Sequence, residues 1–271
     1  MSGAEAADSD DWESHWKAYA EAARLNPAQR YRHALLISQL RALGARPGDR
    51  LLDIGSGQGD FLVLATRALP GLELAGFEMS REGVAIARAR LPRARFHQAD
   101  LFAPPAELSA YAGWAGFAVC SEVLEHLDQP EEFLSRARTY LQPGGNLLVT
   151  VPAGPLSAFD QHIGHRRHYT VATLAEVARR GGLEIVKIDR AGFPFFNLYK
   201  LLVVMSGRRL VSHPAAGQGR PARLLSRLFG VFFLGNLSAS PFGWQLLALL
   251  RRPLSRDCTA ARDTSTTSVS G

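Results

Sequence analysis

The sequence is poor in cysteine, and its first residues do not resemble an export signal. Its 271 residues contain two cysteines, Cys120 and Cys258. Two are too few for a disulfide framework, and their sequence contexts differ too much to suggest a pair. Residues 1–11 are small and acidic, with no basic start and no apolar run. We therefore expect no signal peptide, a disordered beginning and a cytoplasmic protein.

Long apolar runs are also missing. The two longest, Phe193–Met205 and Leu224–Leu237, fall short of the roughly 20 residues that a membrane-spanning helix needs. Lys200 and Arg227 interrupt them. This pattern argues against a transmembrane segment but leaves open a helix that lies in the membrane interface, at the inner membrane surface.

Acidic residues are absent from one long stretch. The chain has 31 basic and 25 acidic residues and a net charge of +6, yet Arg190 to Arg256 holds ten Lys and Arg and no Asp or Glu. The remainder of the chain then holds 21 basic residues against the same 25 acidic ones. The chain therefore has one basic, apolar segment, and the rest of it has a slight excess of acidic residues.

The sequence does contain a regular alternation of short apolar runs and helical patterns. The runs are Arg50–Ile54, Leu72–Phe77, Arg95–His97, Gly116–Ser121, Asn146–Val151, Leu183–Ile188 and Trp244–Leu250; the helical patterns between the early runs are Asp60–Ala68, Arg81–Arg90 and Pro130–Tyr140. This alternation predicts an α/β fold with a mostly parallel sheet and helices on both faces. Two further helices are expected within residues 12–45, the second beginning at Asn26-Pro27. The Ser/Thr-rich tail, residues 255–271, should be disordered.

A glycine-rich turn follows the first apolar run. It reads Asp53-Ile54-Gly55-Ser56-Gly57-Gln58-Gly59-Asp60, and glycines between a strand and a helix let the backbone approach a ligand closely. A dinucleotide-binding turn would place its third glycine where Asp60 stands, and Asp53 is a poor neighbour for a pyrophosphate. We therefore expect a cationic ligand. S-adenosylmethionine fits, because its amino group and its sulfonium are both positive.

Two more acids follow the next apolar runs. Glu78 ends the second run just over 20 residues after the turn, where a carboxylate can accept both ribose hydroxyls. Asp100-Leu101 follow the third run and can meet an exocyclic adenine amine.

The order D-x-G-x-G-x-G, then Glu, then Asp resembles the class I S-adenosylmethionine-dependent methyltransferases, as does the turn Leu141–Gly145. The resemblance implies a Rossmann-like, seven-stranded sheet. It also implies that Asp53 or its neighbours hold the methionyl amine, Glu78 the ribose, and Asp100 with Leu101 the adenine. The full implied cofactor set is Asp53, Gly55, Ser56, Gly57, Gly59, Glu78, Met79, Asp100, Leu101 and Ser121.

The motif Ser121-Glu122-Val123-Leu124-Glu125-His126 ends the fourth run. If Glu122 opens a turn or helix, then Glu122, Glu125 and His126 share one face. Two carboxylates and an imidazole together can bind a divalent ion. The alternative is that this motif shapes the cofactor site without a metal.

Histidines gather in residues 159–170, after the fifth run, at the carboxyl end where such sheets bind ligands. With the preceding motif, this segment resembles the ubiquinone-biosynthesis O-methyltransferases and the small-RNA 3′-terminal 2′-O-methyltransferases. The resemblance implies that Glu122, Glu125, His126 and His165 hold Mg²⁺ or a similar ion, which lowers the pKa of a substrate hydroxyl. Without a metal, one of His126, His162 and His165 would act as the general base.

The segment from residue 189 to residue 243 is far too long for a simple hairpin loop between the last two expected strands. We expect a helical insertion there. It either packs on the domain or forms an oligomer interface. Alternatively, it presents an apolar, basic surface to an anionic or lipid-like substrate or to a membrane. The methyltransferase domain should span residues 12–254, with residues 12–45 closing over the cofactor.

These features together predict an S-adenosylmethionine-dependent methyltransferase that O-methylates a small or lipid-like, anionic acceptor. An N- or C-methyltransferase of a natural-product or cell-envelope intermediate stays open. An RNA methyltransferase is the alternative that the sequence pI of 9.7 raises. The basic residues alternate with bulky apolar ones instead of forming a basic stripe, which disfavours nucleic acid. A third possibility is a cofactor-binding subunit without activity.

Overall fold

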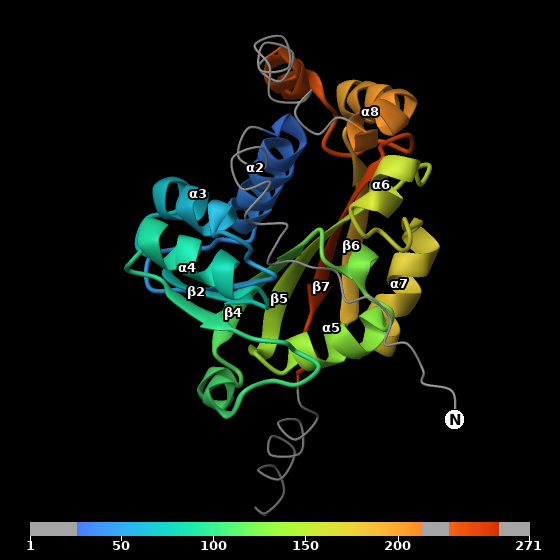
Figure 1. Cartoon of the computed structure of the whole chain (residues 1–271). Helices are drawn as coiled ribbons and strands as arrows, with labels where there is room; N and C mark the ends of the chain where they lie inside the picture. Colours follow the sequence, from blue (N-terminus) through green and yellow to red (C-terminus); the bar gives the residue numbers. More distant parts are fainter. Residues whose placement is uncertain (1–25, 213–227, 255–271) are drawn as a thin grey trace, which may run out of the picture.

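The computed structural model describes residues 26–212 and 228–254 (Figure 1). The two ends expected to be disordered, 1–11 and 255–271, lie outside these residues. So does the first part of the expected helices in residues 12–45.

Seven strands form one sheet in the order β3-β2-β1-β4-β5-β7-β6. The strands are β1 Arg50–Ile54, β2 Glu73–Glu78, β3 Arg95–Gln98, β4 Ala115–Ser121, β5 Leu141–Pro152, β6 Glu184–Ala191 and β7 Gln245–Arg251. Neighbours among β1 to β5 pair in parallel, and β7 lies antiparallel between β5 and β6. The predicted α/β fold with its seven-stranded, mostly parallel sheet is confirmed.

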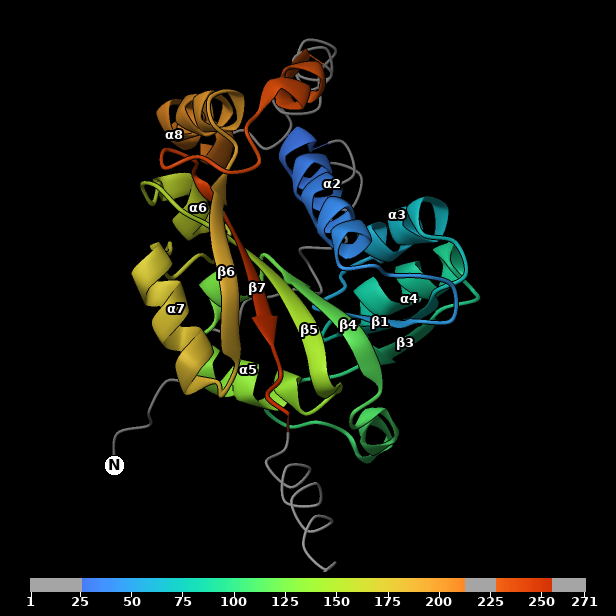
Figure 2. The ribbon, with the colours of Figure 1, turned by 180° about the vertical axis from the view of Figure 1, so that it is seen from behind.

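Helices cover both faces of this sheet (Figure 2). They are α2 Pro27–Ala42, α3 Asp60–Ala68, α4 Arg81–Arg90, α5 Pro130–Arg138, α6 Ala158–His162, α7 Val171–Arg180 and α8 Phe195–Ser212, with 3₁₀ turns η1 Ala106–Tyr111, η2 Leu124–His126 and η4 Phe233–Gly235. Successive strand residues point to opposite faces, so Leu51 packs in the core under α2, α3 and α4, whereas Leu52 packs in the core under α5 and α7. None of the helices among the described residues is long and apolar enough to cross a membrane.

Local signals explain where several helices begin. Asn26 caps α2 by accepting a hydrogen bond from the Ala28 amide at 2.9 Å, with Pro27 in the first turn, as predicted. Helix α6 was not predicted. It begins at a capping box in which Ser157 and Asp160 bond each other's backbone amides.

The last two strands enclose the expected helical insertion. Helix α8 follows β6, and residues 228–232 are helical before η4 and β7. Phe196, Phe229 and Phe233 pack with Ala28 in a separate small core. The insertion is therefore attached to the start of α2.

Candidate functional site

The glycine turn lies between β1 and α3 at the carboxyl edge of the sheet. Gly55, Gly57 and Gly59 have φ angles of 76°, 53° and 77°, a left-handed conformation that glycine adopts at little cost. Within this turn the buried Ser56 hydroxyl has no hydrogen-bond partner among the described residues. The turn therefore offers an unsatisfied polar atom where the sequence predicts a ligand.

Two acidic side chains, Asp53 and Glu78, lie next to this turn. Asp53 is 3% exposed, and burial, followed by the nearby Glu78 and Asp60 carboxylates, raises its pKa to about 8. The Glu78 carboxylate accepts hydrogen bonds from the Gly57 amide at 2.7 Å and the Ser80 amide at 2.9 Å. Glu78 thus fixes the glycine turn, and its oxygens retain acceptor capacity for hydroxyls. A cationic ligand would offset the charge gathered here.

The other predicted cofactor residues lie at the ends of the neighbouring strands. Met79 follows β2 and is 46% exposed. After β3, Leu101 is buried, and the exposed Asp100 accepts a hydrogen bond from the Phe102 amide at 2.8 Å. Ser121, at the end of β4, shares a 2.8 Å hydrogen bond with Thr150. Because β3, β2, β1 and β4 are consecutive neighbours, the structure gathers the set along one edge.

Glu122 does not join the ligand set that the sequence predicts for it. Its φ of 56° is left-handed, an uncommon conformation for a residue other than glycine, and the 3₁₀ turn η2 begins only at Leu124. The expected common face of Glu122, Glu125 and His126 therefore does not form. The Glu122 carboxylate instead accepts a hydrogen bond from Gln245 at 2.9 Å and lies 3.5 Å from Arg32.

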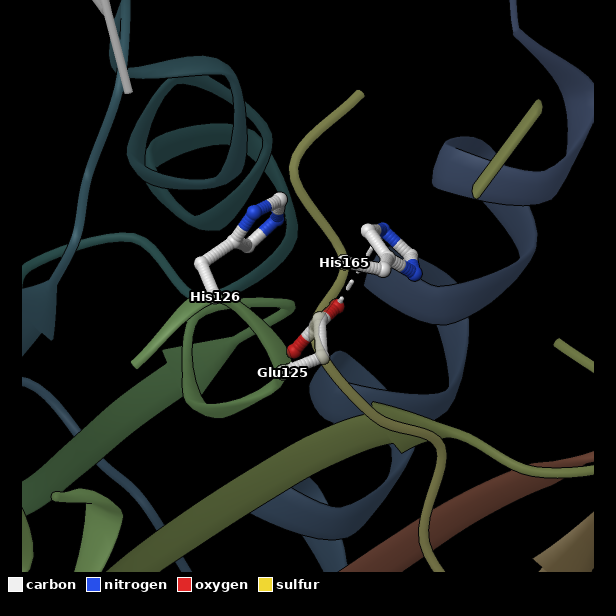
Figure 3. A group of neighbouring side chains, drawn as sticks. All are labelled: Glu125, His126 and His165. Carbon is white, nitrogen blue, oxygen red and sulfur yellow. Dashed lines mark ion pairs between the residues drawn. The ribbon is translucent and has the colours of Figure 1, made fainter. Parts of the chain in front are cut away.

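Glu125, His126 and His165 do come together. Each contributes a potential ligand atom, and these atoms lie within 4.8 Å of one another. Figure 3 shows Glu125 and His126 projecting from the turn after β4 and His165 approaching from the segment after α6. The Glu125 carboxylate is fully buried and accepts no hydrogen bond from the described residues, with His165 Nε2 3.9 Å away.

Glu125 and His165 favour their neutral forms. Burial, reinforced by Glu122, raises the pKa of Glu125 well above its usual value. Burial, with His126 nearby, lowers the pKa of His165 to about 3. A buried carboxyl and two imidazoles are suited to a divalent cation, which would replace the carboxyl proton.

Hydrogen bonds assign the tautomer of His165. His168 Nδ1 lies 3.2 Å from the Gly154 carbonyl oxygen, which only accepts, so this nitrogen carries the proton. Since burial also lowers the pKa of His168, its Nε2 is an acceptor. His165 Nδ1, 3.3 Å away, must then donate to it. The lone pair of His165 is left on Nε2, which faces Glu125.

A buried ion pair supports these histidines from the other side. Asp160 is 1% exposed and accepts hydrogen bonds from Ser157 and from Lys200 Nζ, the latter at 2.9 Å. It lies 4.0 Å from His165 Nδ1. Sequence reasoning missed both Asp160 and Lys200. The S-x-x-D spacing before α6, and a single lysine in an apolar run, were the available signals.

His162 stands apart from this cluster. It is the last residue of α6 and is exposed, whereas His165 and His168 point inward.

A hollow of about 290 Å³ borders His126 and is lined by Phe102, His126, Leu127, Asp128, Gln129 and Arg166. The second hollow described, of about 500 Å³, is lined by residues of α4, β3, η1 and the loop between α4 and β3, and contains none of the predicted site residues.

Comparison with known proteins gives several matches. The chain is 29% identical over 216 residues to an uncharacterised 37.1 kDa transposon protein of Streptomyces fradiae, covering 75% of this chain and 61% of that protein. It is 32% identical to trans-aconitate 2-methyltransferase of Rhizobium meliloti, covering 52% and 50%, and 25% identical to the ubiquinone biosynthesis O-methyltransferase of Aeromonas salmonicida, covering 57% and 71%. The chain thus spans half to six tenths of the length of the first two relatives.

Solved structures with low identity share the fold. The cyclase SpnF matches with a TM-score of 0.62 at 19% identity, covering 93% of this chain and 98% of its own. Geranyl diphosphate methyltransferase in complex with GPP and sinefungin matches with a TM-score of 0.57 at 14% identity, covering 83% and 77%. A profile of the methyltransferase domain matches residues 28–188, more than half of the chain. The chain therefore belongs to the class I S-adenosylmethionine-dependent methyltransferases.

Proposed function

We propose that this protein transfers the methyl group of S-adenosylmethionine to a hydroxyl oxygen of a small or lipid-like, anionic acceptor. The observation that carries the acceptor chemistry is the buried cluster of Glu125, His126 and His165, with the lone pair of His165 Nε2 directed toward Glu125. Family membership supports methyl transfer but does not by itself specify the acceptor atom.

The cofactor fits the residues around the glycine turn. Glu78 supplies hydrogen-bond acceptors, Asp53 supplies a buried carboxyl that a bound cation would ionise, and Ser56 supplies an unsatisfied hydroxyl. When bound, S-adenosylmethionine supplies an electrophilic methyl carbon on a sulfonium. The chain then has to align the acceptor with that carbon, take up its proton and exclude water, because the transfer is an in-line displacement.

The acceptor-side cluster favours a divalent ion over a histidine base. Glu125, His126 and His165 would hold the ion, which would lower the pKa of a hydroxyl placed beside it. A histidine whose pKa is about 3 is a weak base toward a hydroxyl at neutral pH. Glu122, held by Arg32 and Gln245, would act as a nearby countercharge outside the ligand set.

The test is to follow S-adenosylhomocysteine formation by the full-length protein with panels of phenols, hydroxy acids and lipid extracts. Activity should disappear in EDTA and return with Mg²⁺ or Mn²⁺. Calorimetry should detect Mn²⁺ binding that Glu125→Gln abolishes and the exposed control Glu107→Gln preserves. Unchanged activity in EDTA and in Glu125→Gln would contradict the metal assignment. Cofactor binding without turnover on any panel would contradict methyl transfer.

A further inference from the structure

Two groups of histidine and acidic side chains among the described residues place potential ligand atoms within 4.8 Å of one another. The first is Glu125, His126 and His165, and the second is Asp160, His165 and His168. The two groups share His165, whose Nε2 faces Glu125 and whose Nδ1 lies 4.0 Å from Asp160 Oδ1. A divalent ion therefore has two alternative places beside the same imidazole.

The second group has the outer contacts that are typical of metal ligands. Asp160 Oδ2 accepts hydrogen bonds from the Ser157 amide at 3.0 Å and from the Ser157 hydroxyl at 2.7 Å, and the other oxygen, Oδ1, lies on the His165 side. His168 Nδ1 donates to the Gly154 carbonyl, so the Nε2 lone pair of His168 is directed toward His165 Nδ1. In metal centres such contacts orient the carboxylate and imidazole ligands. One carboxylate and two imidazoles are also a donor set that divalent transition metals accept.

An ammonium group already lies at this second group. Lys200 Nζ is 2.9 Å from Asp160 Oδ1, the oxygen that would be the metal ligand. Both side chains are largely withdrawn from solvent, with 14% of the Lys200 side chain and 2% of the Asp160 side chain exposed. A divalent ion on the same oxygen would lie next to the ammonium, and the two positive charges would repel each other strongly because burial weakens their screening.

Lys200 belongs to helix α8, so the insertion supplies this cation. We propose that the Lys200 ammonium excludes divalent ions from the group around Asp160. The Nε2 lone pair of His165 is thereby reserved for an ion beside Glu125. The place of the ion beside Glu125 rests on the proposed function, whereas the exclusion by Lys200 does not. The insertion then determines where a cation binds in the site.

The experiment measures Mn²⁺ binding by calorimetry in the full-length protein that carries Glu125→Gln, which removes the proposed ion site from the start. Lys200→Met in this background frees Asp160 from the ammonium, and the affinity for Mn²⁺ should rise by about tenfold or more. Adding Asp160→Asn should abolish the gain, because the carboxylate ligand is removed. Lys187→Met is the matched control, since Lys187 also pairs with an aspartate, Asp189, at 2.9 Å but is 41% exposed on β6 and outside both groups.

A second variant and a second measurement guard against loss of folding. Lys200→Met leaves a buried carboxylate unpaired, which destabilises the fold. Lys200→Gln keeps an amide that donates to Asp160 and removes only the charge, and it should gain Mn²⁺ binding in the same direction. Thermal melting with and without Mn²⁺ accompanies the calorimetry. Mn²⁺ should raise the melting temperature of the Lys200 variants more than that of the Lys187→Met control, because the ion binds only the folded state.

Mn²⁺ binding that appears in either Lys200 variant and disappears with Asp160→Asn supports the proposal. Three results would overturn it. These are no gain in either variant, including a failure of Mn²⁺ to restore folding, an equal gain in the Lys187→Met control, or a Glu125→Gln protein that binds Mn²⁺ through Asp160 while Lys200 is in place. A wild type that binds no Mn²⁺, beside a gain in Lys200→Met with Glu125→Gln, would support the exclusion and contradict only the ion site of the proposed function.

Discussion

The two halves of the proposed site are built differently. On the cofactor side, Asp53 and the glycines come from one continuous stretch, and Glu78 already bonds the turn through Gly57. On the acceptor side, Glu125, His165 and Lys200 come from three separate segments, and the Glu125 carboxylate lacks a hydrogen bond from the described residues. The first half depends on local backbone geometry, whereas the second depends on contacts between distant parts of the chain.

This difference predicts separable effects of substitution. A substitution on the cofactor side should alter the affinity for S-adenosylmethionine. Methyl transfer to the acceptor can still be measured in such a variant at saturating cofactor. A change on the acceptor side should alter turnover at unchanged cofactor affinity. Variants that mix the two effects would show that the halves are not independent.

The largest effect is expected at His165. His165→Gln removes the imidazole nitrogen that would hold the divalent ion, and turnover at saturating S-adenosylmethionine should fall by about 100-fold or more. His162→Gln, in the same segment but exposed, should stay within about threefold of wild type. Steady-state kinetics and cofactor calorimetry on both variants make the comparison. Equal losses in the two variants would remove His165 from its assigned role.

The next effect is expected at Asp53. Asp53→Asn keeps the shape but removes the buried carboxyl that would ionise beside the bound cation, so cofactor affinity should fall by about 100-fold, or about 2.7 kcal/mol. Glu73→Gln at the exposed start of β2 is the control and should bind normally. Calorimetry measures both dissociation constants. If Asp53→Asn binds S-adenosylmethionine as wild type does, the charge argument for the cofactor fails.

A smaller effect is expected at His168, which fixes the tautomer of His165. His168→Phe removes the acceptor for the His165 Nδ1 proton, and metal affinity should fall about tenfold to 100-fold. Long-range ¹H–¹⁵N spectra of the metal-free protein should show His165 protonated on Nδ1 in wild type and a mixture of tautomers in the variant. A wild-type His165 protonated on Nε2 would contradict the assignment.

The same contrast explains what the sequence could predict. Strand β1 and helices α3 and α4 have the predicted bounds, because apolar runs and caps are local signals. The places of the proposed cofactor residues in the fold were predictable for the same reason, since these residues lie at or shortly after the ends of strands. The left-handed Glu122 was not, because its conformation is held by Gln245 and Arg32, which are remote in sequence. Asp160 and Lys200 were missed because their pairing exists only once α6 and α8 pack together.

The smallest effect, at most about 1.4 kcal/mol per pH unit, is a pH dependence of stability that has opposite sign in the two halves. The pKa of Asp53 rises from 3.8 to about 8 on folding, so the native protein holds an extra proton between these values and its free energy of unfolding falls as pH rises. The pKa of His165 falls from 6.5 to about 3, so the unfolded chain holds the extra proton there. The contribution of His165 to the free energy of unfolding is therefore complete above pH 6.5 and is lost as the pH falls toward 3.

Urea unfolding of the metal-free protein at several pH values checks both signs. Relative to wild type, Asp53→Asn should gain stability with rising pH between about 4 and 8, by at most about 1.4 kcal/mol per pH unit. His165→Gln should lose relative stability as pH rises to 6.5 and then show no further change. Parallel pH curves for the three proteins would mean that neither group changes its pKa on folding. The charge contrast between the two halves would then have to come from residues other than these two.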